Sequence, residues 1–342
     1  MIALPSSKGP KQVLLRDIAE ATGYTVNTVS RALKNKPDIA DSTCEYIQSV
    51  ADQMGYVRNS IASSLRTGRT RTISVIVGDI ANPFFAGMIN LLHDAAQKIG
   101  YSVLVLCSRD DSEQEEKAVI TSIERRVDGV LLFPTIHCRT SIKRMQQAHI
   151  PFVLVSRHTQ NIDYDYVVCD DEKGGYLATK HLIEAGHRKL AFYCRNEVIY
   201  SSRGRYQGML RAAAEAGIPQ ENVVSYLQGD TASLSEKLHQ WKSTGVTGIF
   251  AFCDLEVWQL IAQMETDGML HDFSIVGFDN IQSMLEYPYP LCTIDGGMEK
   301  QISTAVDLLM KRIHGDTSPP RAVVYDVKLV CRGSCRHAFS KS

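Results

Sequence analysis

The feature that most constrains the fold is an alternation of short apolar runs with amphipathic helical stretches, which begins near Thr72. The first apolar runs lie at 73–77, 103–107 and 130–133, and the last lies at 323–330. Strand–helix alternation on this scale produces parallel sheets joined by right-handed crossovers. About 270 residues are too many for one minimal sheet. We therefore expect an α/β core of two lobes, each built on a parallel sheet.

A different pattern, of short helices, precedes this core. Leu15, Ile18 and Ala19 fall on one face of a first helix, which Gly23 ends. Thr25 is a suitable N-cap for a second helix that runs to about residue 33 and begins with polar positions. Two short helices joined by a glycine-containing turn are typical of a helix-turn-helix, whose second helix enters the major groove of DNA.

A third helix and a basic linker are predicted next. Ser42 and Glu45 have the spacing of a capping box, and the apolar stripe that follows them ends at Gly55. Residues 56–72 contain four arginines and no acidic residue. Within this stretch, residues 59–66 can form two turns of helix, and a helix so short is marginal in water. We expect it to be ordered only when a partner binds it.

The charge of the chain divides at the same place. The net charge is −1, but residues 1–71 contain ten Lys or Arg and six Asp or Glu, which gives +4 and leaves −5 for the remainder. A basic head on an acidic body indicates that only the head meets a polyanion, here double-stranded DNA.

The segment 15–34, LRDIAEATGYTVNTVSRALK, resembles the N-terminal signature of the LacI/GalR (lac repressor) family. The segment from Gly55 to Leu65 is similar to the hinge helix of that family, and the resemblance extends over the chain from about residue 13. It implies a sequence-specific transcription regulator, expected to be a repressor, that binds a near-palindromic operator as a homodimer.

The resemblance also implies which residues contact DNA. Val26 and Asn27 occupy the two operator-reading positions of the recognition helix, and Arg31 occupies a third base-contacting position. Ala62 and Leu65 match hinge residues that enter the minor groove, with Leu65 as the wedge that opens the central base step. The full expected set is Leu15, Arg16, Thr25, Val26, Asn27, Thr28, Ser30, Arg31, Asn59, Ala62 and Leu65.

Two positions depart from the family pattern. Leu14 stands where the family usually has a Thr that caps the first helix, so we expect a weaker cap. Arg58 replaces the common Pro before the hinge. The loss of Pro raises the entropy of the unbound hinge, whereas the added charge favours phosphate contact, and either effect can dominate.

The predicted effector site lies in the core. Parallel sheets bind ligands outside the carboxyl ends of their strands, and arginines and carboxylates suit the hydroxyl groups of a sugar. The resemblance implies a core similar to periplasmic sugar-binding proteins, with a sugar or sugar derivative between the lobes. Cys253 stands where the family often has an effector-binding Asn, and Asp254 has the alternative role of a helix N-cap. The resemblance implies that the effector-binding residues are Phe84, Arg157, Arg205, Asp254 and Asp279.

These patterns together predict three domains. They are a helix-turn-helix domain over 12–58, a hinge helix and linker over 59–71, and an effector-binding and dimerisation core over 72–342. Lobe 1 of the core is expected at about 72–168 and 294–322, and lobe 2 at about 169–293 and 323–340.

The nine cysteines are scattered through apolar stretches. Cys331 and Cys335, with His337 close by, have a spacing that hints at a metal site. However, no second pair completes four ligands, and both cysteines fall on one face of a predicted strand. His181 and His187 are expected to cap or pack. We therefore expect reduced structural cysteines, and neither a metal nor a cofactor.

Features that the sequence lacks argue against the other function classes. No apolar run approaches the roughly 20 residues that cross a bilayer, and no secretory signal precedes the helices. We expect a cytoplasmic, nucleoid-associated protein with no membrane partner. Motifs for an acyl-transfer nucleophile, a phosphate-binding loop and a zinc protease are missing, so no enzyme is expected. A solute-binding protein, or an α/β enzyme without a DNA role, is the alternative. The segment after Ser334 has no leucine heptads, which favours a dimer over a tetramer.

Overall fold

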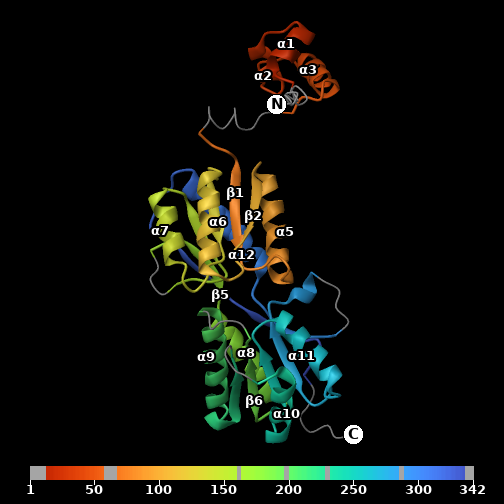
Figure 1. The fold of residues 1–342 in the computed structure, drawn as a ribbon, viewed down its shortest axis with the longest axis vertical. Helices are drawn as coiled ribbons and strands as arrows, with labels where there is room; N and C mark the ends of the chain where they lie inside the picture. The colour runs from red at the N-terminus through yellow and green to blue at the C-terminus, as the bar shows by residue number, and fades with distance from the viewer. Residues whose placement is uncertain are drawn as a thin grey trace, which may run out of the picture. The chain divides into compact units, whose positions relative to one another are not determined.

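The computed structural model describes residues 13–57, 68–159, 163–195, 200–227, 232–284 and 289–335. The chain divides into two compact units, Met1–Gly68 and Arg69–Ser342. Most of their helices and some of their strands are labelled in Figure 1.

Three helices form the described part of the N-terminal unit. They are α1 (Leu15–Thr22), α2 (Val26–Ala32) and α3 (Asp41–Gln53). Ile18, Val29 and Ile47, one from each helix, are fully buried at the centre of their packing. Because each helix offers only a few apolar side chains, the three depend on one another for stability.

The ends of these helices agree only in part with the sequence prediction. Gly23 adopts a left-handed conformation (φ 75°) and ends α1, as expected. The predicted capping box of Ser42 and Glu45 is wrong, because the N-cap position of α3 is Ala40, two residues earlier, and the helix has no side-chain cap. Asp41 instead places a carboxylate in the first turn, where the helix dipole favours negative charge.

The second unit contains two six-stranded sheets, one in each lobe. The first sheet has the order β11-β5-β4-β3-β1-β2, and the second has the order β12-β10-β9-β8-β6-β7. All neighbouring strands are parallel except β10 and β12, which are antiparallel. The predicted α/β core with two lobes is therefore confirmed.

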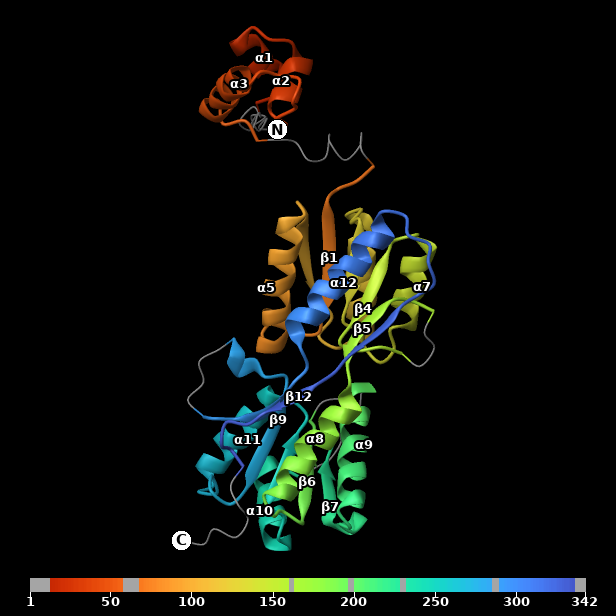
Figure 2. The same cartoon turned by 180° about the vertical axis from the view of Figure 1, so that it is seen from behind.

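In lobe 1, two helices cover each face of the sheet (Figures 1 and 2). Helices α5 (Pro83–Lys98) and α12 (Met298–Ile313) lie on one face, and α6 (Ser112–Glu124) and α7 (Arg139–Gln147) lie on the other. The strands are β1 (Thr72–Val77), β2 (Ser102–Cys107), β3 (Gly129–Leu132), β4 (Phe152–Val155), β5 (Tyr166–Cys169) and β11 (Ala322–Tyr325).

Lobe 2 repeats this arrangement. Helices α8 (Asp171–Glu184) and α9 (Tyr200–Glu215) cover one face of its sheet, and α10 (Leu234–Thr244) and α11 (Asp254–Thr266) cover the other. Two short 3-10 helices are η1 (Gln220–Asn222) and η2 (Ile281–Ser283). The strands are β6 (Leu190–Tyr193), β7 (Val223–Tyr226), β8 (Gly248–Ala251), β9 (Ser274–Phe278), β10 (Cys292–Asp295) and β12 (Lys328–Val330).

The chain passes between the lobes three times. It crosses after β5, after β10, and between β11 and β12, where Figure 2 shows one dark-blue segment running from the first lobe to the second. The prediction of a single strand over 323–330 in lobe 2 is wrong. Residues 322–325 pair with β5 in lobe 1, and only 328–330 pair with β10 in lobe 2. Asp326 interrupts the strand, because its carboxylate accepts the N–H of Val327 at 2.9 Å.

The second predicted lobe boundary needs a smaller correction. Strand β10 pairs with β9, so Ile294 and Asp295 belong to lobe 2 and not to lobe 1. The chain returns to lobe 1 at Gly296 and Gly297, directly before α12. Gly297 has a φ of 70°, a conformation that favours glycine.

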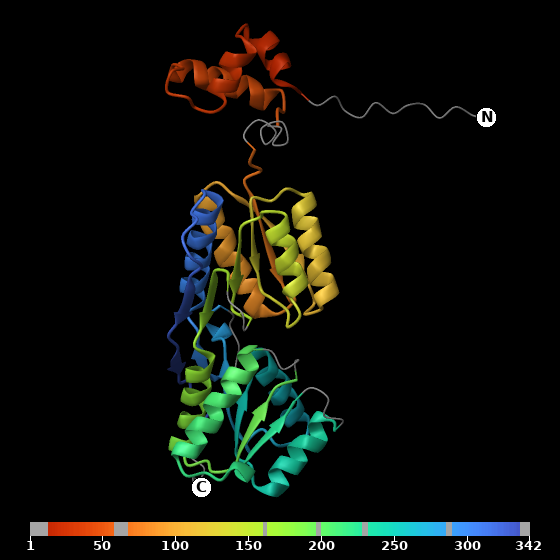
Figure 3. The same ribbon diagram turned by 90° about the vertical axis from the view of Figure 1, so that its left-hand side faces the viewer.

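Helices α8 and α9 lie side by side in lobe 2 with their backbones in contact (Figure 3). A Cβ atom at Gly175 of α8 would overlap the carbonyl oxygen of Arg205, and one at Gly208 of α9 would overlap the carbonyl oxygen of Glu172. Both glycines are therefore required for this close packing, which brings the N-terminus of α8 next to Arg205.

We predict that Gly175→Ala lowers the free energy of unfolding of the core by about 1–3 kcal/mol, because the helices must separate to admit the methyl group. Chemical denaturation measures this loss. Gly204→Ala is the matched control, because its Cβ would lie 3.0 Å from the Asp171 side chain rather than against backbone. An equal loss in both variants would contradict the role assigned to the close packing.

Candidate functional site

The first candidate site is the exposed start of helix α2. The Thr25 hydroxyl accepts the N–H of Thr28 at 3.1 Å and thereby caps the helix as predicted. Val29 and Ala32 are buried, so the opposite face of the helix is turned outward. Thr25, Val26 and Asn27 are exposed, Val26 by 46%. An exposed β-branched side chain beside an amide is suited to contact base edges rather than to pack in a core.

Arg31 forms a bidentate ion pair near the end of the same helix. Its Nε and Nη2 donate to the two carboxylate oxygens of Asp38 at 2.8 and 2.5 Å. Hydrogen bonding to Arg31 holds the pKa of Asp38 below its usual value. Both side chains are about half exposed, 43% and 51%, so the guanidinium is oriented but accessible. The sequence analysis did not identify Asp38, which is seven residues away along the chain.

The other predicted DNA contacts lie in three places. Arg16 is exposed on α1, whereas Leu15, Thr28 and Ser30 are half-buried. The N-terminus of α1 is capped from one side only, because the Asp17 carboxylate accepts the Leu14 N–H at 2.7 Å while Leu14 has no side-chain acceptor. The predicted hinge contacts and the unusual arginine before them lie outside the described residues: Arg58, Asn59, Ala62 and Leu65.

The second candidate site is a cavity of about 170 Å³ between the two lobes of the core. Four of the five predicted effector-binding residues line it, two from each lobe: Phe84, Arg157, Arg205 and Asp279. Phe84 is positioned because α5 begins with Asn82 as its N-cap and Pro83 as its first residue, and the Asn82 carboxamide oxygen accepts the Phe84 N–H at 3.0 Å.

Arg205 is the most constrained side chain of this cavity. Its Nε donates to Asp171 Oδ1 at 2.8 Å and its Nη1 donates to the carbonyl oxygen of Phe252 at 2.5 Å. The guanidinium carbon lies 3.4 Å from the centroid of the Phe278 ring and 4.5 Å from that of Phe252. Burial alone would lower the pKa of Arg205, but the charges of Asp171 and Asp279 outweigh it and raise the pKa. Arg205 is therefore a fixed cation at the cavity wall.

Asp279 presents the acceptor opposite this cation. Its Oδ1 lies 3.7 Å from Arg205 Nη2, and burial raises its pKa to about 7 against the opposing charge of Arg205. The residue has a φ of 99°, and the next residue, Asn280, has a φ of 52°. Two consecutive non-glycine residues in this region indicate backbone that the surrounding structure holds in place.

Asp254 provides that support and does not line the cavity. Its side chain is fully buried. Oδ2 accepts the N–H of Ile281 at 3.0 Å, and Oδ1 accepts the hydroxyl of Thr293 at 2.6 Å. Asp254 is also not the N-cap of α11, since that position is Cys253. Asp254 is thus a positioning residue for the loop that carries Asp279. Its burial, with Asp279 nearby, raises its pKa to about 8.

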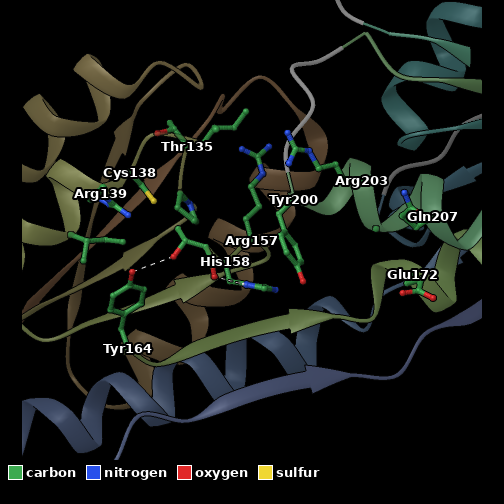
Figure 4. A pocket seen from close by; sticks show the side chains of 15 residues that line it. Thr135, Cys138, Arg139, Arg157, His158, Tyr164, Glu172, Tyr200, Arg203 and Gln207 are labelled. Atoms are coloured by element: carbon green, nitrogen blue, oxygen red, sulfur yellow. Dashed lines mark hydrogen bonds between the residues drawn. The ribbon is translucent and has the colours of Figure 1, made fainter. Parts of the chain in front are cut away.

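A larger cavity of about 570 Å³ lies next to the first, and Arg157 lines both. Arg157 Nη1 donates to Asp110 Oδ1 at 2.6 Å. Figure 4 shows Arg157 and Arg203 reaching into the larger cavity from the two lobes, with Tyr200 between the ribbons. His158 packs against Tyr200, with ring centroids 3.8 Å apart.

Two residues of this site, Asp171 and His158, were missed by the sequence analysis. Asp171 follows Asp170 at the start of α8, where an acidic residue has an ordinary explanation in the helix dipole. His158 follows Arg157 in a segment with no periodic pattern. Their roles depend on contacts with residues far away in sequence, which a local pattern does not encode.

Comparison with known proteins decides the family. Residues 14–59 match the model of bacterial regulatory proteins of the lacI family, and residues 70–237 match that of periplasmic binding proteins and the sugar binding domain of the LacI family. Residues 179–335 match a periplasmic binding protein-like domain. The HTH-type transcriptional regulator DegA of Bacillus subtilis (strain 168) is 31% identical over 287 residues, which are 81% of this chain and 85% of that protein. The chain belongs to the LacI family.

Other relatives of this LacI-family chain agree in length and fold. The HTH-type transcriptional repressor PurR of Actinobacillus pleuropneumoniae serotype 3 (strain JL03) is 28% identical over 331 residues, 94% of this chain and 98% of that protein. A lac repressor dimer bound to operator and an anti-inducer has the same fold, with a TM-score of 0.80. It is 22% identical, and the match covers 95% of this chain and 100% of that chain. A ribose-bound LacI-family regulator of Enterococcus faecium has a TM-score of 0.70 at 26% identity, and covers 78% of this chain and 99% of its own.

These findings establish the class of protein. The chain is a DNA-binding transcription regulator with a helix-turn-helix region and a two-lobed effector-binding core, and its relatives are transcription regulators rather than enzymes. The alternative of a solute-binding protein without a DNA role is thereby excluded. Among the described residues, no helix is both long and apolar enough to cross a membrane.

The two buried carboxyl groups predict how stability depends on pH. Asp254 and Asp279 have pKa values of about 8 and 7, against an ordinary 3.8. Between pH 4 and 7 the folded state retains protons that the unfolded chain releases, so the free energy of unfolding falls as the pH rises. We predict that Asp254→Asn makes this slope shallower by about 1.4 kcal/mol per pH unit between pH 5 and 7. Denaturant titrations at several pH values measure it, and coincident slopes would contradict the assignment.

Proposed function

We propose that this regulator is a homodimeric repressor whose operator affinity is set by a carbohydrate, or a carbohydrate derivative, held between the two lobes. The observation that carries the proposal is the composition of the cavity of about 170 Å³ described above, which we call the inner cavity. Arg157 from lobe 1 faces it from one side, and Arg205 and Asp279 from lobe 2 face it from the other. A ligand that hydrogen-bonds to both lobes favours the closed arrangement over an open one. Such differential affinity is what an effector needs in order to shift a conformational equilibrium.

The chemistry of the inner cavity fits a small polyol. Arg205 supplies fixed donors, Asp279 supplies an acceptor, and Phe84 and Phe85 supply apolar faces for the C–H side of a sugar ring. The relative of Enterococcus faecium contains bound ribose. The larger cavity shares Arg157 with the inner cavity and also contains Arg139 and Arg203. These three arginines suit an anionic substituent on the ligand.

The DNA contacts are proposed from the recognition helix outward. In this proposal Val26, Asn27 and Arg31 read base edges in the major groove, and Thr25, Thr28 and Ser30 contribute contacts around them. The predicted hinge residues Ala62 and Leu65 enter the central minor groove, and Asn59 contributes a further DNA contact. A homodimer places two recognition helices on the two halves of a near-palindromic operator.

The first test concerns base reading by Arg31. An operator is selected from a random-sequence library with the wild-type protein. We predict that Arg31→Ala loses about tenfold to hundredfold in affinity for that operator, and much less for random DNA, because a base contact carries sequence information. Gel-shift or anisotropy titrations measure both affinities, with Lys36→Ala on the neighbouring exposed loop as the control. Equal losses on both DNAs would reassign Arg31 to a phosphate contact.

The second test concerns the effector. Sugars, sugar phosphates and nucleobases are screened for an increase in the melting temperature of the protein, and the best ligand is titrated into the operator complex. We predict that Asp279→Asn preserves operator affinity but weakens the ligand response at least about tenfold, as expected when one charge-assisted hydrogen bond is lost. Asn is chosen because it tolerates the positive φ.

The control for the second test is Asp94→Asn on the exposed side of α5. It should respond to the ligand as the wild-type protein does. A full response in Asp279→Asn, or stabilisation by nucleobases alone, would exclude the proposed carbohydrate site.

A further inference from the structure

A group of potential metal ligands lies in lobe 2, and none of its members lines either cavity described above. Within the described part of the chain, His181, Cys292 and Cys335 each place one ligand atom within 4.8 Å of the others. Cys331 joins them, because its Sγ lies 3.6 Å from Cys292 Sγ and 3.8 Å from His181 Nε2. Three thiols and one imidazole therefore converge at one place.

The structure removes both arguments against a metal site at Cys331 and Cys335, namely the shared strand face and the lack of further ligands. Cys331 and Cys335 do not share the face of a strand, since β12 ends at Val330. Gly333, with a φ of 97°, turns the segment that contains both cysteines. The two missing ligands come from distant parts of the chain, His181 from α8 and Cys292 from β10.

We propose that His181, Cys292, Cys331 and Cys335 form a tetrahedral site for Zn²⁺. Zinc–sulfur bonds of about 2.3 Å and zinc–nitrogen bonds of about 2.0 Å place the corners of a tetrahedron about 3.5–3.8 Å apart. The distances of 3.6 Å between Cys292 and Cys331 and 3.8 Å between Cys331 and His181 match such corners. Three soft thiolates with one imidazole favour zinc over calcium or magnesium, which prefer oxygen ligands.

The cysteines do not form disulfides, and hydrogen bonds fix the backbone that carries them. A separation of 3.6 Å between the sulfur atoms of Cys292 and Cys331 is far longer than the roughly 2.05 Å of a disulfide. The Ser334 hydroxyl donates to the carbonyl oxygen of Ile275 at 2.6 Å and accepts the Cys292 N–H at 2.7 Å. The backbone N–H of Arg332 donates to Cys292 Sγ at 3.3 Å. The turn is thus fixed against the sheet independently of a metal.

A metal at this place would add a covalent link among elements that already pack together, namely α8, β10 and the segment after β12. Strand β12 is the edge strand of its sheet and pairs only with β10. Zinc would link the segment after β12 to β10 and to α8, and so fasten the last segment that crosses between the lobes. Arg332, inside the turn, also donates to Asn280 Oδ1 at 2.7 Å, next to Asp279 of the effector cavity.

The experiment uses the full chain, purified under a reductant and stripped of metal with a chelator. Native mass spectrometry during a Zn²⁺ titration should give one zinc per chain. Co²⁺ in its place should give the absorption of a tetrahedral thiolate complex. At 100 times the dissociation constant, zinc should raise the melting temperature by about 5 °C or more.

Variants identify the ligands. Cys331→Ser is the primary variant, since this exposed side chain is not needed for packing, and Cys335→Ser is the second. Each should weaken zinc binding at least about tenfold, as loss of a metal-site interaction does, and lose most of the thermal shift. Cys107→Ser in lobe 1 is the control and should bind as the wild-type protein does. Absence of one-to-one binding in the wild-type protein, or unchanged binding in Cys331→Ser, would overturn the proposal.

Discussion

The effector cavity depends on one buried cation, Arg205. A guanidinium that is 6% exposed is stable inside a protein only if its charge and its donors are matched. Asp171 and the carbonyl oxygen of Phe252 accept its hydrogen bonds, and the rings of Phe278 and Phe252 cover its faces. Removing one partner would leave an uncompensated charge, so these residues act as a unit. A ligand therefore meets a preformed donor array rather than a flexible side chain.

The position of this cation follows from backbone packing. Gly175 and Gly208 let α8 and α9 approach until their backbones touch, which places Asp171, at the start of α8, within reach of Arg205 on α9. The acceptor on the opposite side is fixed in another way. The loop with Asp279 and Asn280 has two positive φ angles and is held by a hydrogen bond from the Ile281 N–H to the Asp254 carboxylate. Two different backbone constraints thus converge on one cavity wall.

The local elements were predictable from the sequence, whereas the pairings between distant elements were only partly so. Alternating strands and helices, the break at Gly23 and the cap at Thr25 follow from period and propensity, which act over a few residues. The division of 322–330 between two sheets was not predicted, because both halves are largely apolar and only Asp326 and Val327 separate them. The rule that parallel strands align their carboxyl ends made Phe84, Arg157 and Asp279 candidates. The family resemblance then selected them together with Arg205, which lies in helix α9.

The errors and omissions in the site have a common cause. Asp254 follows a strand just as a ligand-binding residue does, but its side chain turns inward to backbone that lies 27 residues later. Asp171 and Asp38 act through partners on other elements, and His181 lies 150 residues from Cys331. Spacing along the chain identifies which residue types lie at the edge of a sheet where its strands end. It does not identify the partner that each side chain meets.

The route from effector to DNA is constrained by how the linker enters the core. Asp128 of lobe 1 accepts the backbone N–H groups of Thr70 and Arg71 at 2.8 and 3.0 Å, and the Thr70 hydroxyl at 2.9 Å. Arg69 donates to the carbonyl oxygen of Ile313 at the end of α12. Residues 69–71, the described end of the linker, therefore bind to lobe 1 and lead directly into β1. In the homodimer proposed above, an effector that closes lobe 2 onto lobe 1 can change DNA affinity only if it also moves lobe 1 relative to the partner subunit. Because coupling between sites is reciprocal, operator binding must then change effector affinity by the same factor.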